Sequence, residues 1–207
     1  MEIVFATNNK HKLKEIQALM PEGIAILSLS DIGCTDEIEE TEPTLEGNAR
    51  LKADHVTKNY GYPCFSDDTG LEVEALNGAP GVYSARYAGE GATFENNMEK
   101  LLQQMEGQQN RFGRFRTVIA LNIDDCQYLF EGICEGNILK QKQGTAGFGY
   151  DPVFQPKGYE RTFAEMDMAE KGKISHRGQA IKKLIEFLKF LILNQKTSPY
   201  RSFNDVK

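Results

Sequence analysis

The sequence lacks an apolar run long enough to cross a membrane, and nothing at its start resembles a targeting segment. Met1 and Glu2 lead directly into the apolar run Ile3 to Ala6, with no cationic start and no cleavage site. The longest apolar stretch, residues 187–193, contains Lys189 and is far shorter than the roughly 20 residues that a membrane helix needs. We therefore expect a cytoplasmic protein that contacts no membrane.

Positive charge and metal-binding cysteine patterns are also scarce. A net charge of -6 and a pI near 5.2 argue against a nucleic-acid-binding surface, because such surfaces need Lys and Arg to displace phosphate counterions. The four cysteines form no C-x-x-C pair and have no His at ligand spacing, so we expect free, buried thiols and no structural zinc at Cys34, Cys64, Cys126 and Cys134.

Two common nucleotide-binding motifs are absent as well. No G-x-x-x-x-G-K-[ST] sequence occurs, and the glycines near Gly147 do not follow G-x-G-x-x-G. The main evidence for a P-loop protein or a Rossmann dehydrogenase is therefore missing.

The chain is nevertheless an ordinary globular one. Its 207 residues, 40% hydrophobic and 26% charged, are enough for one sizeable α/β domain with its own core. No internal repeat, low-complexity tract or linker divides it. We predict one domain over residues 1–207, with a polar tail from about residue 195.

Hydrophobic periodicity predicts strands that alternate with helices, which is typical of an α/β sheet. The expected strands cover residues 2–6, 24–29, 71–74, 115–123 and 128–139. The expected helices cover residues 13–19, 44–60 with Thr44 as cap, 93–106 and 181–192. We interpret residues 67–70 as a turn, residues 77–91 as a long loop, and Asp124-Asp125 as a hairpin turn.

A first candidate site is the polar segment Thr7-Asn8-Asn9-Lys10-His11-Lys12, where the opening strand becomes a helix. Backbone N–H groups at a helix start favour phosphate, and the Asn and Lys side chains add donors. The alternative is that Thr7 or Asn8 only caps the helix and the lysines are solvated.

A second candidate site is acidic and combines Glu39-Glu40 with Asp67-Asp68. Magnesium is usually held by one or two carboxylates, while substrate phosphates and waters complete its coordination. A further carboxylate beside the ion could orient water as a general base. The alternative is that residues 67–70 form only a turn rich in Asp and Gly.

Two further segments could hold the rest of a nucleotide. In residues 146–152, Phe148 and Tyr150 flank Gly149, so an aromatic face could stack on a purine; the alternative is two core aromatics. Lys171 and the sequence Ser175-His176-Arg177-Gly178 precede the last helix and could bind an anion or a carbonyl; the alternative is surface salt bridges.

Taken together and in this order, the motifs resemble the inosine triphosphate pyrophosphatase family, the non-canonical purine NTP pyrophosphatases. The likeness runs from the first strand to the last helix. It rests on residues 7–12, Glu39-Glu40-Thr41, Glu46-Gly47-Asn48-Ala49, residues 66–71, residues 78–87, residues 147–152 and residues 175–178.

The resemblance implies an elongated α/β structure of two lobes around a long mixed central β-sheet flanked by helices, with the active cleft between the lobes. It also implies Mg²⁺-dependent hydrolysis of ITP, dITP and XTP to the monophosphate and pyrophosphate by a homodimer.

By the same resemblance, Asp68 is the catalytic proton acceptor and binds the metal together with Glu39, while Lys52 and Asp67 support the phosphate and metal site. The implied substrate contacts are Thr7, Asn8, Asn9, Lys10, His11, Lys12, Lys52, Thr69, Phe148, Gly149, Tyr150, Asp151, Lys171, His176 and Arg177. Asn8 stands where many members have Gly, which puts the geometry of the phosphate loop in question. Thr69 replaces a common Ser, and the tail extends past the usual end.

Two other functions stay open from the residues alone. A related pyrophosphatase for modified pyrimidine nucleotides, or a nucleotidyltransferase, would use the same metal and phosphate groups. A non-catalytic nucleotide sensor would bind without turnover, although the intact carboxylates Glu39, Asp67 and Asp68 argue against it.

Overall fold

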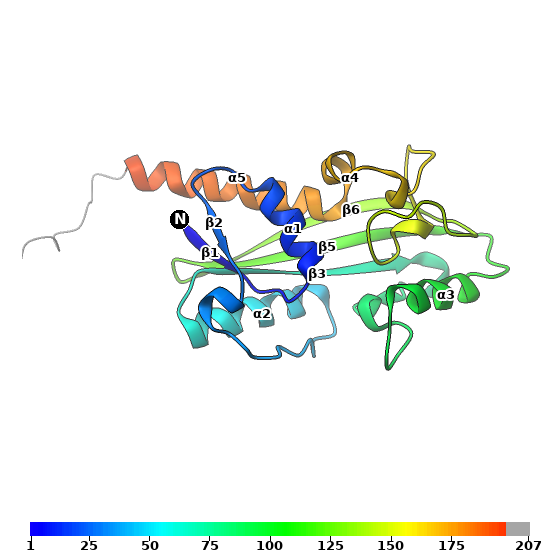
Figure 1. The fold of residues 1–207 in the computed structure, drawn as a ribbon, viewed down its shortest axis with the longest axis horizontal. Helices are drawn as coiled ribbons and strands as arrows, with labels where there is room; N and C mark the ends of the chain where they lie inside the picture. Colours follow the sequence, from blue (N-terminus) through cyan, green and yellow to red (C-terminus); the bar gives the residue numbers. More distant parts are fainter. Residues whose placement is uncertain (198–207) are drawn as a thin grey trace, which may run out of the picture.

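The computed structural model describes residues 1–197 and shows an elongated molecule built on one mixed β-sheet (Figure 1). The strands are β1 Glu2–Phe5, β2 Ala25–Leu27, β3 Cys64–Val73, β4 Pro80–Gly81, β5 Phe112–Ile123, β6 Cys126–Ile138 and β7 Phe154–Pro156. The α-helices are α1 Lys10–Leu19, α2 Leu45–Tyr60, α3 Phe94–Gln104, α4 Met168–Ile174 and α5 His176–Thr197.

The sheet has the order β2-β1-β3-β5-β6-β7, and the short β4 pairs with β3. β1 is parallel to β2 and β3, whereas β3, β5, β6 and β7 pair in antiparallel fashion. Three long strands, β3, β5 and β6, extend along the molecule and set its length (Figure 1). The expected mixed central sheet is confirmed.

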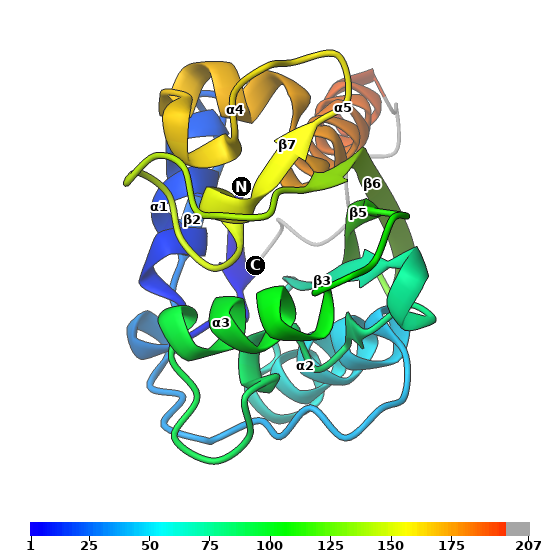
Figure 2. The ribbon, with the colours of Figure 1, turned by 90° about the vertical axis from the view of Figure 1, so that its right-hand side faces the viewer.

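The helices cover both faces of this sheet. α4 and α5 lie above it and α2 and α3 below it in the end view of Figure 2. At the end of the molecule that holds α2 and α5, Ile16 of α1 and Leu184 of α5 pack on Phe5 and Phe65, whose rings stack at 4.7 Å. A separate core at the other end joins α3 to β5 and β7. Two smaller cores pack α2 against β1, β3 and β5.

Several helices and strands begin or end at the residues that the sequence predicts. The Thr44 side chain caps α2 by accepting from Gly47 N at 3.0 Å, and Gly61, in the left-handed region, ends the helix after Tyr60. Asp124 and Asp125 both have positive φ and join β5 to β6, as a two-residue hairpin turn requires.

Other expectations were wrong. Residues 67–70 lie inside the ten-residue strand β3, where Asp67 and Asp68 pair with Ile119 and Val118 of β5, so they form no turn. The expected loop over residues 77–91 contains β4 and the 3-10 turn Ser84–Arg86. α4 was not expected, and α5 continues to Thr197; the rest of the predicted tail lies outside the described residues.

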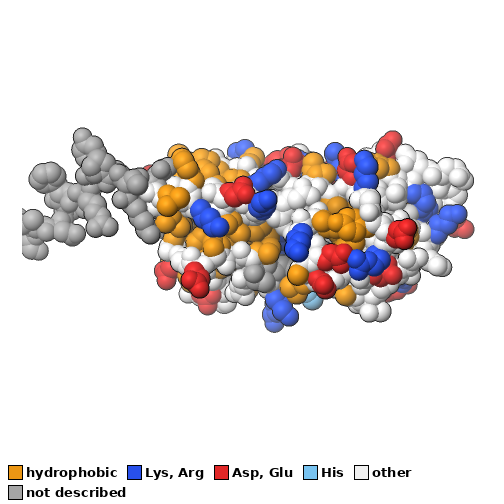
Figure 3. Space-filling view, turned by 90° about the horizontal axis from the view of Figure 1, so that it is seen from above, with side chains coloured by type: hydrophobic (Ala, Val, Ile, Leu, Met, Phe, Trp, Pro, Cys, Tyr) orange, Lys and Arg blue, Asp and Glu red, His pale blue; other side chains and the backbone are white. Residues whose placement is uncertain are grey.

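Two further predictions concern the burial of the cysteines and the absence of a membrane-spanning helix. Cys126 is exposed, whereas Cys34, Cys64 and Cys134 are buried as predicted. Within residues 1–197, no helix is long and apolar enough to cross a membrane. On the face shown in Figure 3, Lys and Arg side chains are interspersed with Asp and Glu, and hydrophobic side chains gather between them.

Candidate active site

A cavity of about 360 Å³ lies between the core that joins β1 to α2 and the core beside α3, and it collects most of the predicted site residues. Its lining includes Leu29 from the core beside β1 and Phe115 from the core beside α3. The predicted residues that line it are Thr7, Asn8, Asn9, Lys12, Lys52, Asp68, Thr69, Phe148, Gly149, Tyr150, Asp151, Lys171, His176 and Arg177. Segments up to 170 positions apart in the chain thus meet in one place.

Four predicted residues do not line this cavity. Lys10 and His11 are exposed on the first turn of α1, and the His11 ring stacks on Phe148 with centroids 5.3 Å apart. Asp67 is buried next to the cavity at 1% exposure. Glu39 is exposed, and its neighbour Glu40 lines the cavity instead.

The start of α1 is built by side-chain caps. Asn9 Oδ1 accepts from His11 N at 2.9 Å and from Lys12 N at 3.2 Å, so Asn9 is the cap, and not Thr7 or Asn8. Thr7 Oγ1 accepts from Asn9 N at 3.1 Å and fixes the preceding turn. The positive end of the helix dipole therefore faces the cavity, where it favours an anion.

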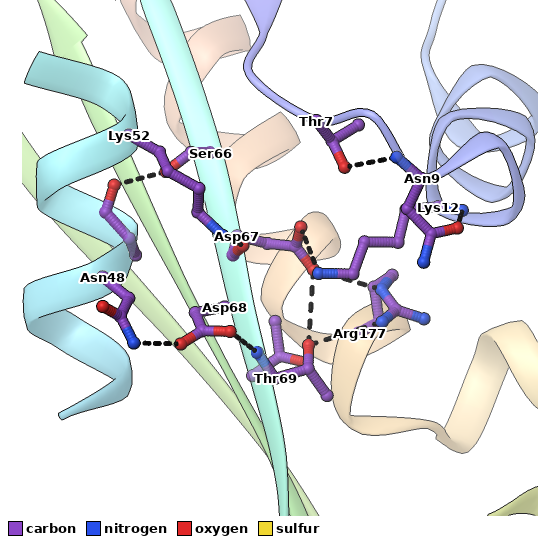
Figure 4. A network of polar contacts seen from close by, with 12 residues as sticks. Thr7, Asn9, Lys12, Asn48, Lys52, Ser66, Asp67, Asp68, Thr69 and Arg177 are labelled. Carbon is purple, nitrogen blue, oxygen red and sulfur yellow. Dashed lines mark hydrogen bonds and ion pairs between the residues drawn. The ribbon is translucent and has the colours of Figure 1, made fainter. Parts of the chain in front are cut away.

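Asp67 holds two cations together under the cavity (Figure 4). Its Oδ1 accepts from Lys12 Nζ at 3.0 Å and its Oδ2 from Arg177 Nε at 3.4 Å. Burial alone would raise the pKa of Asp67, but the nearby Lys12, Arg177 and Lys52 charges hold it well below its usual value. Asp67 is therefore an anion that positions two cations at the cavity.

Asp68 lies on the opposite side of β3, toward α2 (Figure 4). Its Oδ2 accepts from Asn48 Nδ2 at 3.1 Å and its Oδ1 from Thr69 N at 2.8 Å. Burial raises the pKa of Asp68, and the Glu40 charge adds to the rise, while Lys52 opposes it. A carboxylate with a raised pKa inside a cavity is suited to accept a proton.

Lys52 of α2 connects the acidic groups. Its Nζ donates to Asp67 O at 2.8 Å and to Glu40 Oε1. Burial opposes ionisation of Glu40, yet Lys52 lowers the pKa of the Glu40 carboxyl below its usual value. The structure therefore brings Glu40, Lys52 and Asp68 to the same cavity, whereas Glu39 is exposed.

The glycine loop is organised by Asp151. Asp151 Oδ2 accepts from Phe148 N at 2.9 Å and from Lys171 Nζ at 2.7 Å. A Cβ at Gly147 would lie 2.1 Å from that oxygen, so only glycine fits there. Tyr150 is buried and donates its hydroxyl to Ser84 O at 2.9 Å, which joins this loop to the segment after β4.

Phe148 is the aromatic face of the cavity. Lys171 Nζ and the Arg177 guanidinium lie 4.9 and 5.4 Å from its ring centroid, respectively. Phe94, which the sequence analysis missed, also lines the cavity and lies 6.0 Å from Phe148 between centroids. Phe94 is 45% exposed and directly follows the helix cap Thr93. A Phe at this position of a predicted helix was the one signal in the sequence.

His176 is a deeply buried polar residue of the cavity. It is 3% exposed, its ring stacks on Phe115 at 4.5 Å, and its Nδ1 has no hydrogen-bond partner among the described residues. Burial, together with the charges of Arg177 and Lys171, holds the pKa of His176 well below its usual value. A neutral imidazole with a buried unpaired nitrogen can recognise a polar edge of a ligand.

Comparison with known proteins agrees with this fold. The family model of the Ham1 family matches residues 3–187. A dITP/XTP pyrophosphatase from Flavobacterium psychrophilum is 60% identical over 189 residues, covering 91% of this chain and all of the relative. A dITP/XTP pyrophosphatase from Porphyromonas gingivalis is 52% identical and covers 90% of this chain and 97% of the relative.

Solved structures give the same result. The HAM1 protein from Coxiella burnetii superposes with a TM-score of 0.86 at 40% identity, covering 92% of this chain and 99% of that one. The Ham1 protein from Staphylococcus aureus superposes with a TM-score of 0.85 at 40% identity and covers 92% and 100%. The resemblance drawn from the motifs is confirmed, and this chain belongs to the Ham1 family.

Proposed function

We propose that this chain hydrolyses non-canonical purine nucleoside triphosphates (ITP, dITP and XTP) to the monophosphate and pyrophosphate. The relatives at 52–60% identity that are named dITP/XTP pyrophosphatase support this activity. The observation on which it depends most is that one cavity joins acidic, cationic and aromatic groups. These are the groups that a nucleotide's metal, phosphates and base each need.

The acidic residues fit a magnesium ion. Glu40 and Asp68 are carboxylates at the same cavity, and Mg²⁺ is typically held by one or two carboxylates plus substrate phosphates. We propose Glu40 in place of Glu39 as the partner of Asp68. A bound Mg²⁺ supplies charge neutralisation on the phosphates of the substrate.

Asp68 is then the proton acceptor for in-line attack of water on the α-phosphorus. Its raised pKa and its two hydrogen bonds leave it oriented and able to take a proton. Lys12, which Asp67 holds in place, neutralises charge on the leaving pyrophosphate. Lys52 and the capped start of α1 support the same phosphates.

The other end of the cavity binds the base. Hypoxanthine and xanthine present a 6-oxo acceptor where adenine presents an amino donor, and His176 and Arg177 offer donors to that position. Phe148 provides a stacking face.

One experiment tests the reaction and the position of attack. We expect that ITP and Mg²⁺ in ¹⁸O-labelled water give label in the monophosphate, since water attacks the α-phosphorus. Label in the pyrophosphate would contradict this mechanism. An Asp68→Asn enzyme is expected to lose about 100- to 10,000-fold in kcat with a small change in KM, because general base catalysis contributes on that order.

The same assay separates the other functions. A nucleotide sensor binds ITP but shows no Mg²⁺-dependent release of pyrophosphate, and an enzyme for modified pyrimidines prefers those substrates in a parallel screen. A homodimer, which the motif resemblance implies, and a cytoplasmic location, which the sequence analysis expects, also remain proposals. Light scattering on the purified full-length chain would test the dimer.

A further inference from the structure

Three side chains that can bind a metal lie together outside the cavity. Two of them, Cys34 and Asp36, come just before Glu37 in the chain, and the third, His55, is on α2. The Sγ of Cys34, a carboxylate oxygen of Asp36 and a ring nitrogen of His55 all lie within 4.8 Å of one another. His55 Nε2 is 2.7 Å from Asp36 Oδ2. None of the three residues lines the candidate active site, so this cluster is separate from Glu40 and Asp68.

The fold holds these residues in position by different means. Cys34 is 7% exposed, packs with Leu29 and Val56, and donates its backbone N–H to Leu29 O at 2.9 Å. His55 is half-buried on α2, next to the fully buried Val56. Cys34 and His55 are 21 positions apart, so the spacing rules that argue against zinc from the sequence do not apply to this pair.

We propose that Cys34, Asp36 and His55 form a Zn²⁺ site. Thiolate, imidazole and carboxylate are the ligands that zinc prefers, and three protein ligands leave a fourth position for water. This proposal is independent of the proposed pyrophosphatase activity.

Neighbouring polar groups support the ligands. Tyr60 Oη donates to Asp36 Oδ2 at 2.9 Å, and the Asn59 side chain lies 3.2 Å from His55 Nδ1. Such outer contacts orient metal ligands and fix the imidazole tautomer. Binding at Nε2 requires that Nδ1 carry the ring proton, so Asn59 accepts from it through Oδ1 after an amide flip. The thiol proton of Cys34 goes to solvent as the ion binds.

The site has a consequence for the cavity. Residues 34–36 continue directly into Glu37, Ile38 and Glu40, which line it, and α2 carries Lys52 as well as His55. A bound zinc ion would therefore link residues 34–36 to α2 and restrict the movement of Glu40.

Cobalt spectroscopy on the full-length, reduced protein tests the site. Co²⁺ replaces Zn²⁺, and excess Mg²⁺ is added to occupy the carboxylates of the cavity. We expect a thiolate-to-cobalt charge-transfer band in the near ultraviolet, and its loss when Zn²⁺ is added. The band must disappear in Cys34→Ser and stay in the matched control Cys126→Ser, which removes an exposed cysteine outside the cluster.

Further variants keep the test decisive if Cys34→Ser, in a buried position, folds poorly. His55→Ala changes a half-buried side chain and is expected to remove tight Co²⁺ binding, while Tyr60→Phe weakens it by about 10- to 100-fold. Asp68→Asn leaves the band unchanged. No band in the wild type, or a band that persists in both Cys34→Ser and His55→Ala, would overturn the proposal.

Discussion

Asp67 and Asp68 are adjacent in the sequence but have opposite environments. Alternation along β3 directs Asp67 toward the cations Lys12 and Arg177 and Asp68 toward Asn48 of α2. The pKa of Asp67 is lowered and that of Asp68 is raised. Paired carboxyls whose environments separate their pKa values commonly divide structural and proton-accepting roles between them.

The raised pKa of Asp68 can be measured directly. We expect the ¹³C carboxyl signal of Asp68 in the metal-free protein to titrate above the usual Asp value, because burial disfavours the anion. Added Mg²⁺ should shift this titration to lower pH, since a nearby positive charge favours the carboxylate. Asp68→Asn assigns the signal. An ordinary titration unaffected by Mg²⁺ would contradict the role of Asp68.

Asp67 should contribute mainly to stability. Asp67→Asn leaves Lys12 and Arg177 without their buried anion, so we expect the free energy of unfolding to fall by about 3–5 kcal/mol. Because the folded pKa is lowered, this contribution is present above the unfolded pKa and is lost as pH falls below about 4. Urea unfolding across pH tests this, and the exposed Glu99→Gln, which removes the same charge, is the control.

The two neighbouring glutamates make a matched pair for the metal assignment. Glu40→Gln should raise the Mg²⁺ concentration for half-maximal activity by about tenfold or more, because affinity in such sites depends on the number of charged ligands. Glu39→Gln should leave it unchanged, since Glu39 is exposed and does not line the cavity. The reverse result, with an effect at Glu39 alone, would restore the assignment made from the motif.

At the level of elements, the contact between α4 and α5 positions two residues that line the cavity, His176 and Arg177. The Ser175 hydroxyl accepts from Gly178 N at 3.1 Å and caps α5, whose first turn carries His176 and Arg177. A Cβ at Gly178 would lie 1.9 Å from Gly172 O, so the two helices meet backbone to backbone. The start of α5 therefore cannot take a side chain at this position without moving.

Gly178→Ala should accordingly displace this turn. We expect a loss of about 1–3 kcal/mol in stability from overpacking, and a higher KM for the nucleotide. Gly172→Ala is the control, since its Cβ meets only Leu19 Cδ2 at 4.0 Å. It should be neutral or more stable by up to about 1 kcal/mol, because Ala favours a helix over Gly. Thermal unfolding and KM for both variants check this; equal effects would contradict the close-contact explanation.

The ends of helices and strands were predictable where the type of a single residue determines the local backbone conformation. Thr44 as cap and the Asp124-Asp125 turn are of this kind. Residues 67–70 misled the prediction because Asp and Gly disfavour strands locally. The pairing of β3 with β5 and the partners of both carboxylates override that preference. Local composition could not reveal pairing with a strand some 50 positions later.

The cavity as a whole was predictable only through the motifs, because its parts come from the entire chain. Which of Glu39 and Glu40 points inward depends on the path of a loop without a regular period, and Lys52 settles it only in the folded state. Phe94 was missed for a similar reason, since its approach to Phe148 joins segments 54 positions apart.

Base selection is a property of this complete cavity and provides a last test. A donor left unpaired against the 6-amino group of adenine costs on the order of 1–3 kcal/mol, so kcat/KM for ATP should be about 10- to 100-fold below that for ITP. His176→Ala should narrow this ratio, because His176 contributes a polar nitrogen that lacks a partner within the described chain. Phe148→Ala should instead lower both values alike, since any purine ring can stack on a phenyl face. Equal kcat/KM for ITP and ATP in the wild type would mean that His176 and Arg177 do not read the 6-position.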